Sequence, residues 1–286
     1  MTEASYASPA LSRMVLGKTL HRLREEAGIS REMACRAIRA SESKISRLEL
    51  GRTGFKLRDV ADLCTLYGVT DHIQRATLLG MAQLANRPEW WHSFRDVIPT
   101  WFESYLGLEQ AASVIRGYEV QLVPGLLQTP EYARAVIGSG HRGSPEPEIE
   151  RRVELRMRRQ QILHRPQPAR LWALIDEAAL RRPVGGRAIM SAQLRHLLAA
   201  CDMPNVTVQI LTFRGSGHVA ECGFTMLRLP DRELRDVIYL EHLAAALYLD
   251  QLDDVSYYVN MMDLLAVEAE SADATKDILA RILAEV

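Results

Sequence analysis

Hydrophobic positions in the first third of the chain recur at helical spacing. Leu16, Leu20 and Leu23 lie on one face of a helix predicted over residues 13–27, which Gly28 ends. The same spacing, read together with capping residues, predicts four further short helices, over 30–38, 41–51, 60–67 and 70–84. Short helices separated by tight turns predict a compact helical bundle.

Downstream of the bundle the pattern changes to short β-like runs that alternate with longer helical segments. Strands are predicted over 113–120, 170–175, 206–211, 224–229 and 237–240. Helices are predicted over 129–138, 147–163, 187–200, 251–268 and 271–285. Aromatic side chains gather between the two regions, over 90–105, where we expect junction core rather than a ligand pocket.

These patterns predict a fold class and a division of the chain. The fold class is an α-helical N-terminal helix-turn-helix bundle plus a larger mixed α/β (α+β) C-terminal domain. We expect a disordered tail over 1–10, the helix-turn-helix domain over 11–85 and an aromatic-rich junction over 86–110. Residues 111–286 are expected to form a C-terminal domain for sensing or partner binding and for dimerisation.

The net charge of -1 hides an asymmetry between the two regions. Residues 13–58 carry 12 basic against 5 acidic side chains, whereas residues 86–286 carry 22 against 27. A small basic module therefore precedes a mildly acidic body, and a basic module is a candidate for binding nucleic acid.

Cysteine spacing and apolar run lengths exclude several other classes of protein. The four cysteines form no CxxC pair, so neither a disulfide framework nor a zinc ribbon is supported. Cys201, His218 and Cys222 lack the spacing of short zinc motifs, and we expect no metal and no cofactor. No segment reaches the apolar length of a membrane span, so we expect no membrane association and a cytoplasmic location.

The segment from Ser30 to Gly51 places two short helices around a tight turn. The second helix turns few strongly apolar side chains inward, so its polar face must look outward, with Arg47 near the middle of that face. An arginine can form a bidentate pair with guanine O6 and N7, a contact that discriminates by about 1 to 3 kcal/mol. Arg47 is therefore the first candidate for reading bases in the major groove.

The other polar residues of this segment are candidates for weaker or less specific DNA contacts. Glu42 can accept from a cytosine amino group and Ser43 can contact several bases, while cations near the helix suit phosphates. The predicted DNA-binding set is Arg31, Arg39, Ser41, Glu42, Ser43, Lys44, Arg47 and Arg52, in which Arg31, Arg39, Lys44 and Arg52 are assigned to phosphates. The alternative interpretation is a solvated charged face, which the motif spacing disfavours.

The run S-E-S-K-I-S-R-L-E-L-G at 41–51 resembles the Xre, or Cro/C1-type, helix-turn-helix family. The resemblance covers residues 15–68. One departure is Arg31, where the family often has glutamine. The resemblance implies that Arg24 and Glu49 pair and tie the first helix to the recognition helix.

Three runs in the second region carry a further resemblance. They are L-V-P-G-L-L-Q-T-P-E-Y-A-R-A at 122–135, D-E-A-A-L-R-R-P-V-G-G at 176–186 and V-I-Y-L-E at 237–241. In the first run, Thr129 with Pro130 predicts the start of a helix. The runs resemble the C-terminal domain of actinobacterial antitoxin-like transcriptional regulators, which implies a small companion protein as partner.

No nucleophile motif or phosphate loop accompanies the histidines, so we expect no catalytic residues and no enzyme. The arginine-rich run at 151–159 is interleaved with glutamates, which favours a solvated or inter-subunit face over a second nucleic-acid site. The leading hypothesis is a homodimeric transcription regulator that binds double-stranded operator DNA and is controlled by a companion protein or ligand. The alternative is an interaction protein that sequesters a partner and binds DNA only weakly.

Overall fold

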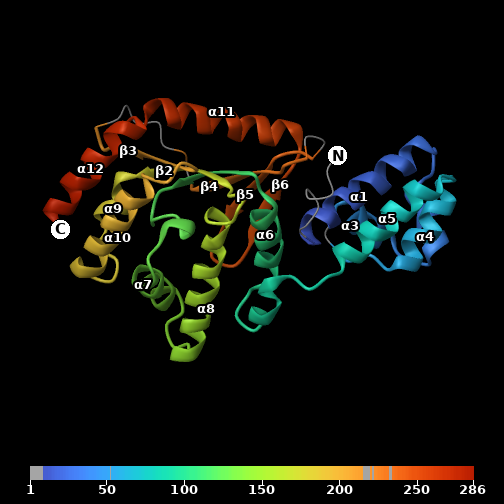
Figure 1. The fold of residues 1–286 in the computed structure, drawn as a ribbon, viewed down its shortest axis with the longest axis horizontal. Coiled ribbons are helices and arrows are strands. Elements are labelled where there is room, and N and C mark those ends of the chain that lie inside the picture. Colours follow the sequence, from blue (N-terminus) through green and yellow to red (C-terminus); the bar gives the residue numbers. More distant parts are fainter. Residues whose placement is uncertain (1–8, 52, 215–219, 221, 232–233) are drawn as a thin grey trace. The chain divides into compact units, whose positions relative to one another are not determined.

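The computed structural model describes the chain apart from residues 1–8, 52, 215–219, 221 and 232–233. Two compact units, Met1–His92 and Ser93–Val286, make up the molecule. In the described residues the first unit is helical, and the second combines a six-stranded mixed sheet with helices (Figure 1). The expected fold class, a helical helix-turn-helix bundle followed by a larger α+β domain, is therefore confirmed.

The described part of the first unit contains the five predicted helices. They are α1 (Pro9–Glu26), α2 (Arg31–Ile38), α3 (Glu42–Glu49), α4 (Leu57–Leu66) and α5 (His72–Ala85), and the 3-10 helix η2 (Trp90–Phe94) follows them. Of the expected disordered tail, residues 1–8 lie outside the described part of the chain. Pro9 and Ala10 belong to α1, because the Ala10 side chain is buried in the unit.

Two glycines let α1 approach the end of α3 closely. A Cβ atom on Gly17 would lie 2.7 Å from the carbonyl oxygen of Glu49, and closer still to that of Leu48. Gly51 has a φ of +65°, and a Cβ atom there would lie 2.7 Å from the Cα of Met14. Only glycine fits at these positions without moving backbone, so α3 is held directly against the backbone of α1.

The sheet of the second unit contains the five predicted strands and one more. The strands are β1 (Val114–Glu119), β2 (Arg170–Asp176), β3 (Val206–Leu211), β4 (Phe224–Arg228), β5 (Val237–Glu241) and β6 (Ala246–Leu249), in the order β3-β2-β1-β4-β5-β6. β1, β2 and β3 are parallel, and β4, β5 and β6 continue the sheet antiparallel. The prediction missed β6 because the strand is short and begins at the last of three consecutive alanines, which show no alternation.

Helices cover both faces of this sheet. They are α6 (Thr100–Ala111), α7 (Pro130–Gly140), α8 (Glu146–Arg159), α9 (Glu177–Arg181), α10 (Arg187–Ala200), α11 (Leu252–Glu268) and α12 (Ala272–Glu285), with 3-10 helices η3 (Gly125–Leu127) and η4 (Gln160–Leu163). α11 runs along one face, and α6, α7, α8 and α10 lie on the other (Figure 1). The α11 face buries an apolar core between the helix side chains Met262 and Leu265 and the strands.

The aromatic-rich stretch contains α6, a helix that the sequence prediction left as a junction. Tyr105 of α6 is buried, and its ring centroid lies 4.1 Å from that of Tyr239 on β5. The guanidinium of Arg159 lies over the rings of Phe102 and Tyr105, at 5.1 and 5.4 Å from their centroids. These rings therefore pack in the core of the second unit.

The loop before α7 is held by two buried glutamines. Gln128 Nε2 donates a hydrogen bond to the carbonyl of Val123 at 2.7 Å. Gln193 of α10 donates to the carbonyl of Leu127 at 2.7 Å and accepts from the amide of Thr129 at 2.8 Å. A buried amide without partners costs about 1 to 3 kcal/mol, so these bonds fasten the loop to α10. Thr129 also caps α7, as predicted.

The arginine-rich run 151–159 lies on α8, and its interpretation as a solvated or inter-subunit face is corrected for Arg156 and Arg159, whereas Arg158 is exposed. Arg159 donates to both carboxylate oxygens of Glu109 on α6, at 2.7 and 2.8 Å, and Glu109 is buried. Arg156 donates to Gln128 Oε1 at 2.8 Å. The sequence pattern could not show these contacts, because the acceptors come from α6 and the loop before α7, which are distant in the sequence and reach the guanidinium groups only in the folded unit.

We expect Gly17→Ala to destabilise the first unit by about 2 kcal/mol, because the added methyl group must displace the α3 backbone. Gly80→Ala is the matched control, since a Cβ atom on Gly80 of α5 meets nothing within 4 Å. That change should stabilise the helix by about 0.5 to 1 kcal/mol. Urea unfolding of the full chain, read by hydrogen exchange in α1 and α3, measures both. Equal effects of the two substitutions would contradict the close approach.

Candidate nucleic-acid interface

Two serine caps and one left-handed residue build the helix pair α2 and α3. The Ser30 side chain accepts from the amide of Met33 at 3.2 Å, and the Ser41 side chain accepts from the amide of Lys44 at 3.3 Å. Between the helices, Arg39 has φ 51° and ψ 50°, and it is the non-glycine residue with positive φ in the described chain. The turn therefore depends on a conformation that a side chain resists.

The inward face of α3 is apolar and its outward face is polar, as predicted. Ile45 and Leu48 are buried in the core of the first unit. Glu42, Ser43 and Arg47 are exposed. Within the described residues no carboxylate lies at ion-pair distance from Arg47, so its guanidinium is available to a ligand.

A buried ion pair braces α3 against α1. Arg24 Nε donates to Glu49 Oε1 at 2.5 Å, and Arg24 Nη2 donates to Glu49 Oε2 at 3.2 Å. Arg24 also donates to the carbonyl of Ile29 at 3.0 Å, in the link between α1 and α2. Both charged residues are buried, so the expectation that they pair and tie the two helices is confirmed.

The electrostatics of Glu49 follow from its partners. Burial alone would raise the pKa of Glu49, but the hydrogen bonds and charge of Arg24, together with His21, outweigh burial and lower it. His21 Nδ1 lies 3.0 Å from Glu49 Oε2. Glu49 therefore stays ionised at neutral pH, and its negative charge holds the arginine in place.

Two of the predicted phosphate ligands already have acidic partners in this structure. Lys44 Nζ lies 2.6 Å from Asp59 Oδ2 of α4, and both side chains are largely buried. Arg31 Nε lies 3.5 Å from Glu49 Oε2, but the Arg31 side chain is 53% exposed. A phosphate contact by Lys44 would compete with Asp59, whereas Arg31 can reach solvent while it stays near Glu49.

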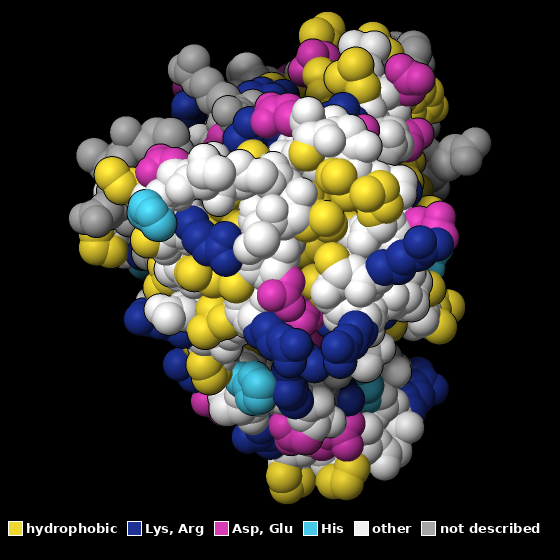
Figure 2. Space-filling view, turned by 90° about the vertical axis from the view of Figure 1, so that its right-hand side faces the viewer, with side chains coloured by type: hydrophobic (Ala, Val, Ile, Leu, Met, Phe, Trp, Pro, Cys, Tyr) yellow, Lys and Arg dark blue, Asp and Glu magenta, His cyan; other side chains and the backbone are white. Residues whose placement is uncertain are grey.

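The remaining predicted residues divide by their surroundings. Arg39 is exposed on the turn, and Ser41 shares its hydroxyl between the α3 cap and Ser43 Oγ at 2.9 Å. Arg52 lies outside the described residues. On the face drawn in Figure 2, Lys and Arg side chains (dark blue) gather beside Asp and Glu (magenta), so charge of both signs is interleaved there.

Sequence reasoning did not find the contributions of Asp59 and His21 to this site. Asp59 anchors Lys44 from fifteen positions away, and His21 approaches Glu49 from another helix. No local pattern connects these pairs, because only packing of the helices brings them together. The weak signal for His21 is its place on α1 one turn before Arg24.

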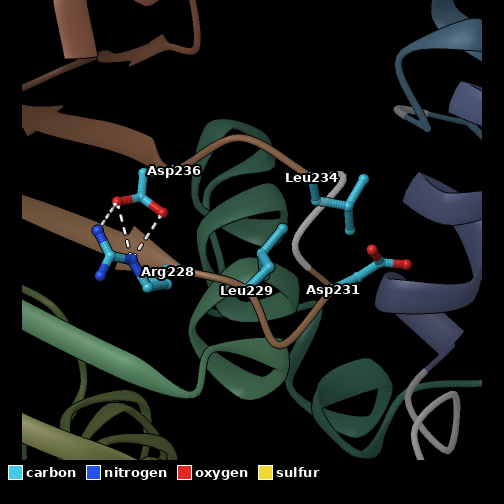
Figure 3. Close-up of a pocket in the computed structure, with 5 residues that line it drawn as sticks. All are labelled: Arg228, Leu229, Asp231, Leu234 and Asp236. Atoms are coloured by element: carbon cyan, nitrogen blue, oxygen red, sulfur yellow. Dashed lines mark hydrogen bonds and ion pairs between the residues drawn. The ribbon is translucent and has the colours of Figure 1, made fainter. Parts of the chain in front are cut away.

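The second unit contains two hollows that are alternative candidate sites. The connection between β4 and β5 lines a hollow of about 310 Å³, in which Arg228 and Asp236 satisfy each other through hydrogen bonds of 2.8 to 3.1 Å (Figure 3). A second hollow, of about 120 Å³, holds His164 and His196, and burial lowers the pKa of His196. In the described chain no group of three or more metal-ligating side chains occurs. His218, weighed in the sequence as a metal ligand, lies outside the described residues.

Comparison with protein families agrees with this architecture. Residues 15–78 match the family described as Helix-turn-helix domain, which is the class of protein that the geometry of α2 and α3 defines. Residues 102–281 match the domain of unknown function DUF5753, and the chain belongs to this family. No curated protein matches the chain, and no solved structure matches it.

The helix-turn-helix domain indicates a DNA-binding regulator. No described helix has the length and apolar character that crossing a membrane would require.

We expect Glu49→Gln to destabilise the first unit by about 3 kcal/mol at neutral pH, because it removes the buried counter-charge of Arg24 and leaves only the exposed Glu25, at 2.6 Å. Since the pKa of Glu49 is lowered by folding, its stabilisation is present above the unfolded pKa and is lost as pH falls through the folded pKa. The difference in free energy of unfolding between wild type and variant should therefore become smaller in acid. Urea unfolding from pH 7 to pH 3, read by hydrogen exchange in α1 and α3, measures it.

Glu26→Gln is the control for that titration, because Glu26 forms an exposed pair with Arg22 at 2.8 Å. It should change stability by no more than about 0.5 kcal/mol. If the free energies of unfolding of the wild type and of Glu49→Gln differ by the same amount at every pH in this range, the role of the ionised carboxylate is contradicted.

We expect Arg39→Gly to separate backbone strain from charge. Glycine adopts the left-handed conformation without a Cβ penalty, so the substitution should stabilise the first unit by about 0.5 to 1 kcal/mol. The same change removes a candidate phosphate ligand, so affinity for DNA should fall and depend less steeply on salt. Arg39→Lys is the control, because it keeps both the charge and the strain. Tighter DNA binding by the glycine variant would rule out the phosphate contact.

Proposed function

We propose that this chain is a sequence-specific transcriptional regulator that reads operator DNA with α3. The observation that carries the proposal is the exposed Arg47 on a short helix whose buried side is clamped to α1 through Arg24 and Glu49. A base-reading helix needs both properties, since discrimination between bases requires a free donor on a rigid support.

Roles for the individual side chains follow from their positions. Arg47 donates to guanine, and Glu42 and Ser43 contact neighbouring base edges near the N-terminus of α3. Arg31 and Arg39 contact phosphates from α2 and the turn, where both are exposed. Ser41, Lys44 and Arg52 complete the proposed set, with Lys44 leaving Asp59 when it binds a phosphate.

The regulator acts as a homodimer in this proposal. One recognition helix contacts few base pairs, so two copies that bind half-sites about one helical turn apart multiply the affinity. The second unit contains the expected C-terminal domain, residues 111–286. In this proposal it holds the dimer together and receives the regulatory signal. The Xre or Cro/C1-type assignment belongs to the proposal, and it is supported by the run at 41–51 and by the Arg24 to Glu49 pair.

Control by a small companion protein, as in antitoxin-like regulators, is the proposed input to the second unit. Its support is the resemblance of three sequence runs of the second unit to the C-terminal domain of antitoxin-like regulators. The competing function is sequestration of a partner with weak DNA binding. It is favoured by the ion pairs of Lys44 and Arg31, which reduce the positive charge offered to phosphates.

We expect Arg47→Ala to weaken binding to the DNA upstream of the coding region about 10- to 100-fold, corresponding to about 1 to 3 kcal/mol. Binding to scrambled DNA of equal length should change little. Fluorescence anisotropy across a salt series measures both. Arg22→Ala on α1 is the control, because it removes the same charge from an exposed ion pair with Glu26. Equal losses on both DNAs would assign Arg47 to phosphates, and no preference in the wild type would favour sequestration.

A further inference from the structure

The outer face of α11 carries large apolar side chains in contact with solvent. Leu252 is 66% exposed, Tyr257 61%, Leu264 49% and Val267 85%. They account for much of the exposed large apolar surface described in the second unit. Large apolar side chains gathered on one element mark an interaction surface more often than scattered ones do.

Three of these residues, Tyr257, Leu264 and Val267, form a seam. Tyr257 and Leu264 are seven positions apart, as are Asn260 and Val267, and Asn260 is also exposed. Residues at these intervals lie on one stripe of a helix, at the a and d positions of a heptad. A helix of 17 residues is about 25 Å long, which suffices for a helix-in-groove or helix-to-helix contact.

The opposite side of α11 is already used by the core. Met262 and Leu265 are fully buried against the sheet, and Val255, Tyr258 and Val259 pack at the edge of the same cluster. The helix is therefore apolar on both sides, which is typical of a helix that is covered on both sides. The sheet covers one side, and in the described residues the outer seam faces solvent.

The charges of α11 select the kind of molecule that covers the seam. The helix contains Asp253, Asp254, Asp263 and Glu268 and no lysine or arginine, and Asp263 Oδ1 lies 3.8 Å from Arg116 Nη1 of β1. In a parallel pair of two α11 helices, each acidic group would face its own copy. In an antiparallel pair, Asp253 and Asp254 would face Glu268 of the copy. Like charges across such a contact are unfavourable, so a second copy of this helix is a poor occupant.

We propose that the outer face of α11 docks a segment of a partner protein that presents an apolar stripe flanked by lysine or arginine. The apolar stripe covers Tyr257, Leu264 and Val267, and a basic flank pairs with Asp253 and Asp254 at the start of the helix. The inference rests on the proposed control through the second unit, and it identifies the outer face of α11 as the surface through which that control acts. It does not depend on DNA binding.

Three synthetic helical peptides serve as probes of the full-length chain. The first has leucine at a and d positions flanked by lysine, the second has the same leucines flanked by glutamate, and the third scrambles the first so that no stripe remains. Isothermal titration calorimetry should show that the lysine-flanked peptide binds at least tenfold more tightly than either of the others. Its affinity should fall with salt, because opposite charges are screened.

Variants of the chain locate the contact. Tyr257→Ser combined with Leu264→Ser should weaken binding of the lysine-flanked peptide at least tenfold. Val267→Ser alone should act in the same direction, and its high exposure keeps the fold intact. Leu243→Ser is the matched control, because this side chain is fully exposed in the turn between β5 and β6, and binding should stay within twofold. Circular dichroism of each variant checks the fold.

Several results would overturn the proposal. They are equal binding of the lysine and glutamate peptides, binding of the scrambled peptide as tight as that of the first, or no binding of any peptide. A dimer that light scattering finds in the wild type and not in the double variant would assign the seam to a second copy. Arg47→Ala separates this proposal from the DNA-reading one, because that variant should bind the lysine-flanked peptide as the wild type does.

Discussion

The buried pair between Arg24 and Glu49 is the interaction on which the first unit depends. It joins α1 to the end of α3 beside the close backbone approach at Gly17, so the direction of α3 is set by two contacts at one end. A charge buried without its partner costs several kcal/mol, and the pair is therefore kept together once the helices pack. The outward face of α3, with Glu42, Ser43 and Arg47 exposed, is left for contact with a ligand.

Charge is used differently in the two units. In the first unit, the arginine at the centre of the α3 outer face points to solvent without an acidic neighbour among the described residues. In the second unit, arginines of α8 donate hydrogen bonds to internal acceptors such as Glu109 and Gln128. Acidic side chains lie near the exposed seam of α11. The exposed Arg47 and the apolar seam with acidic neighbours suit two different partners, as the proposed regulator with an input and an output requires.

Much of the fold was predictable because its signals are local. The helices of the first unit follow from apolar spacing and serine caps, and β3 and α10 have the predicted bounds. The prediction missed α6, because its aromatic residues resemble a junction when α8 and β5 are not known to pack against them. The expectation for the arginine run was wrong at Arg156 and Arg159 for the same reason, since their acceptors come from the loop before α7 and from α6.

The sequence by itself determined most of the helices and strands, the position of α3 and which of its side chains are polar, because these properties depend on neighbours within a few positions. Only the tertiary structure decided which of those side chains remain free. Lys44 is engaged by Asp59, Arg47 is not engaged in the described chain, and α11 keeps an apolar seam in solvent. Availability of a side chain depends on what long-range packing brings beside it, and no local pattern encodes that.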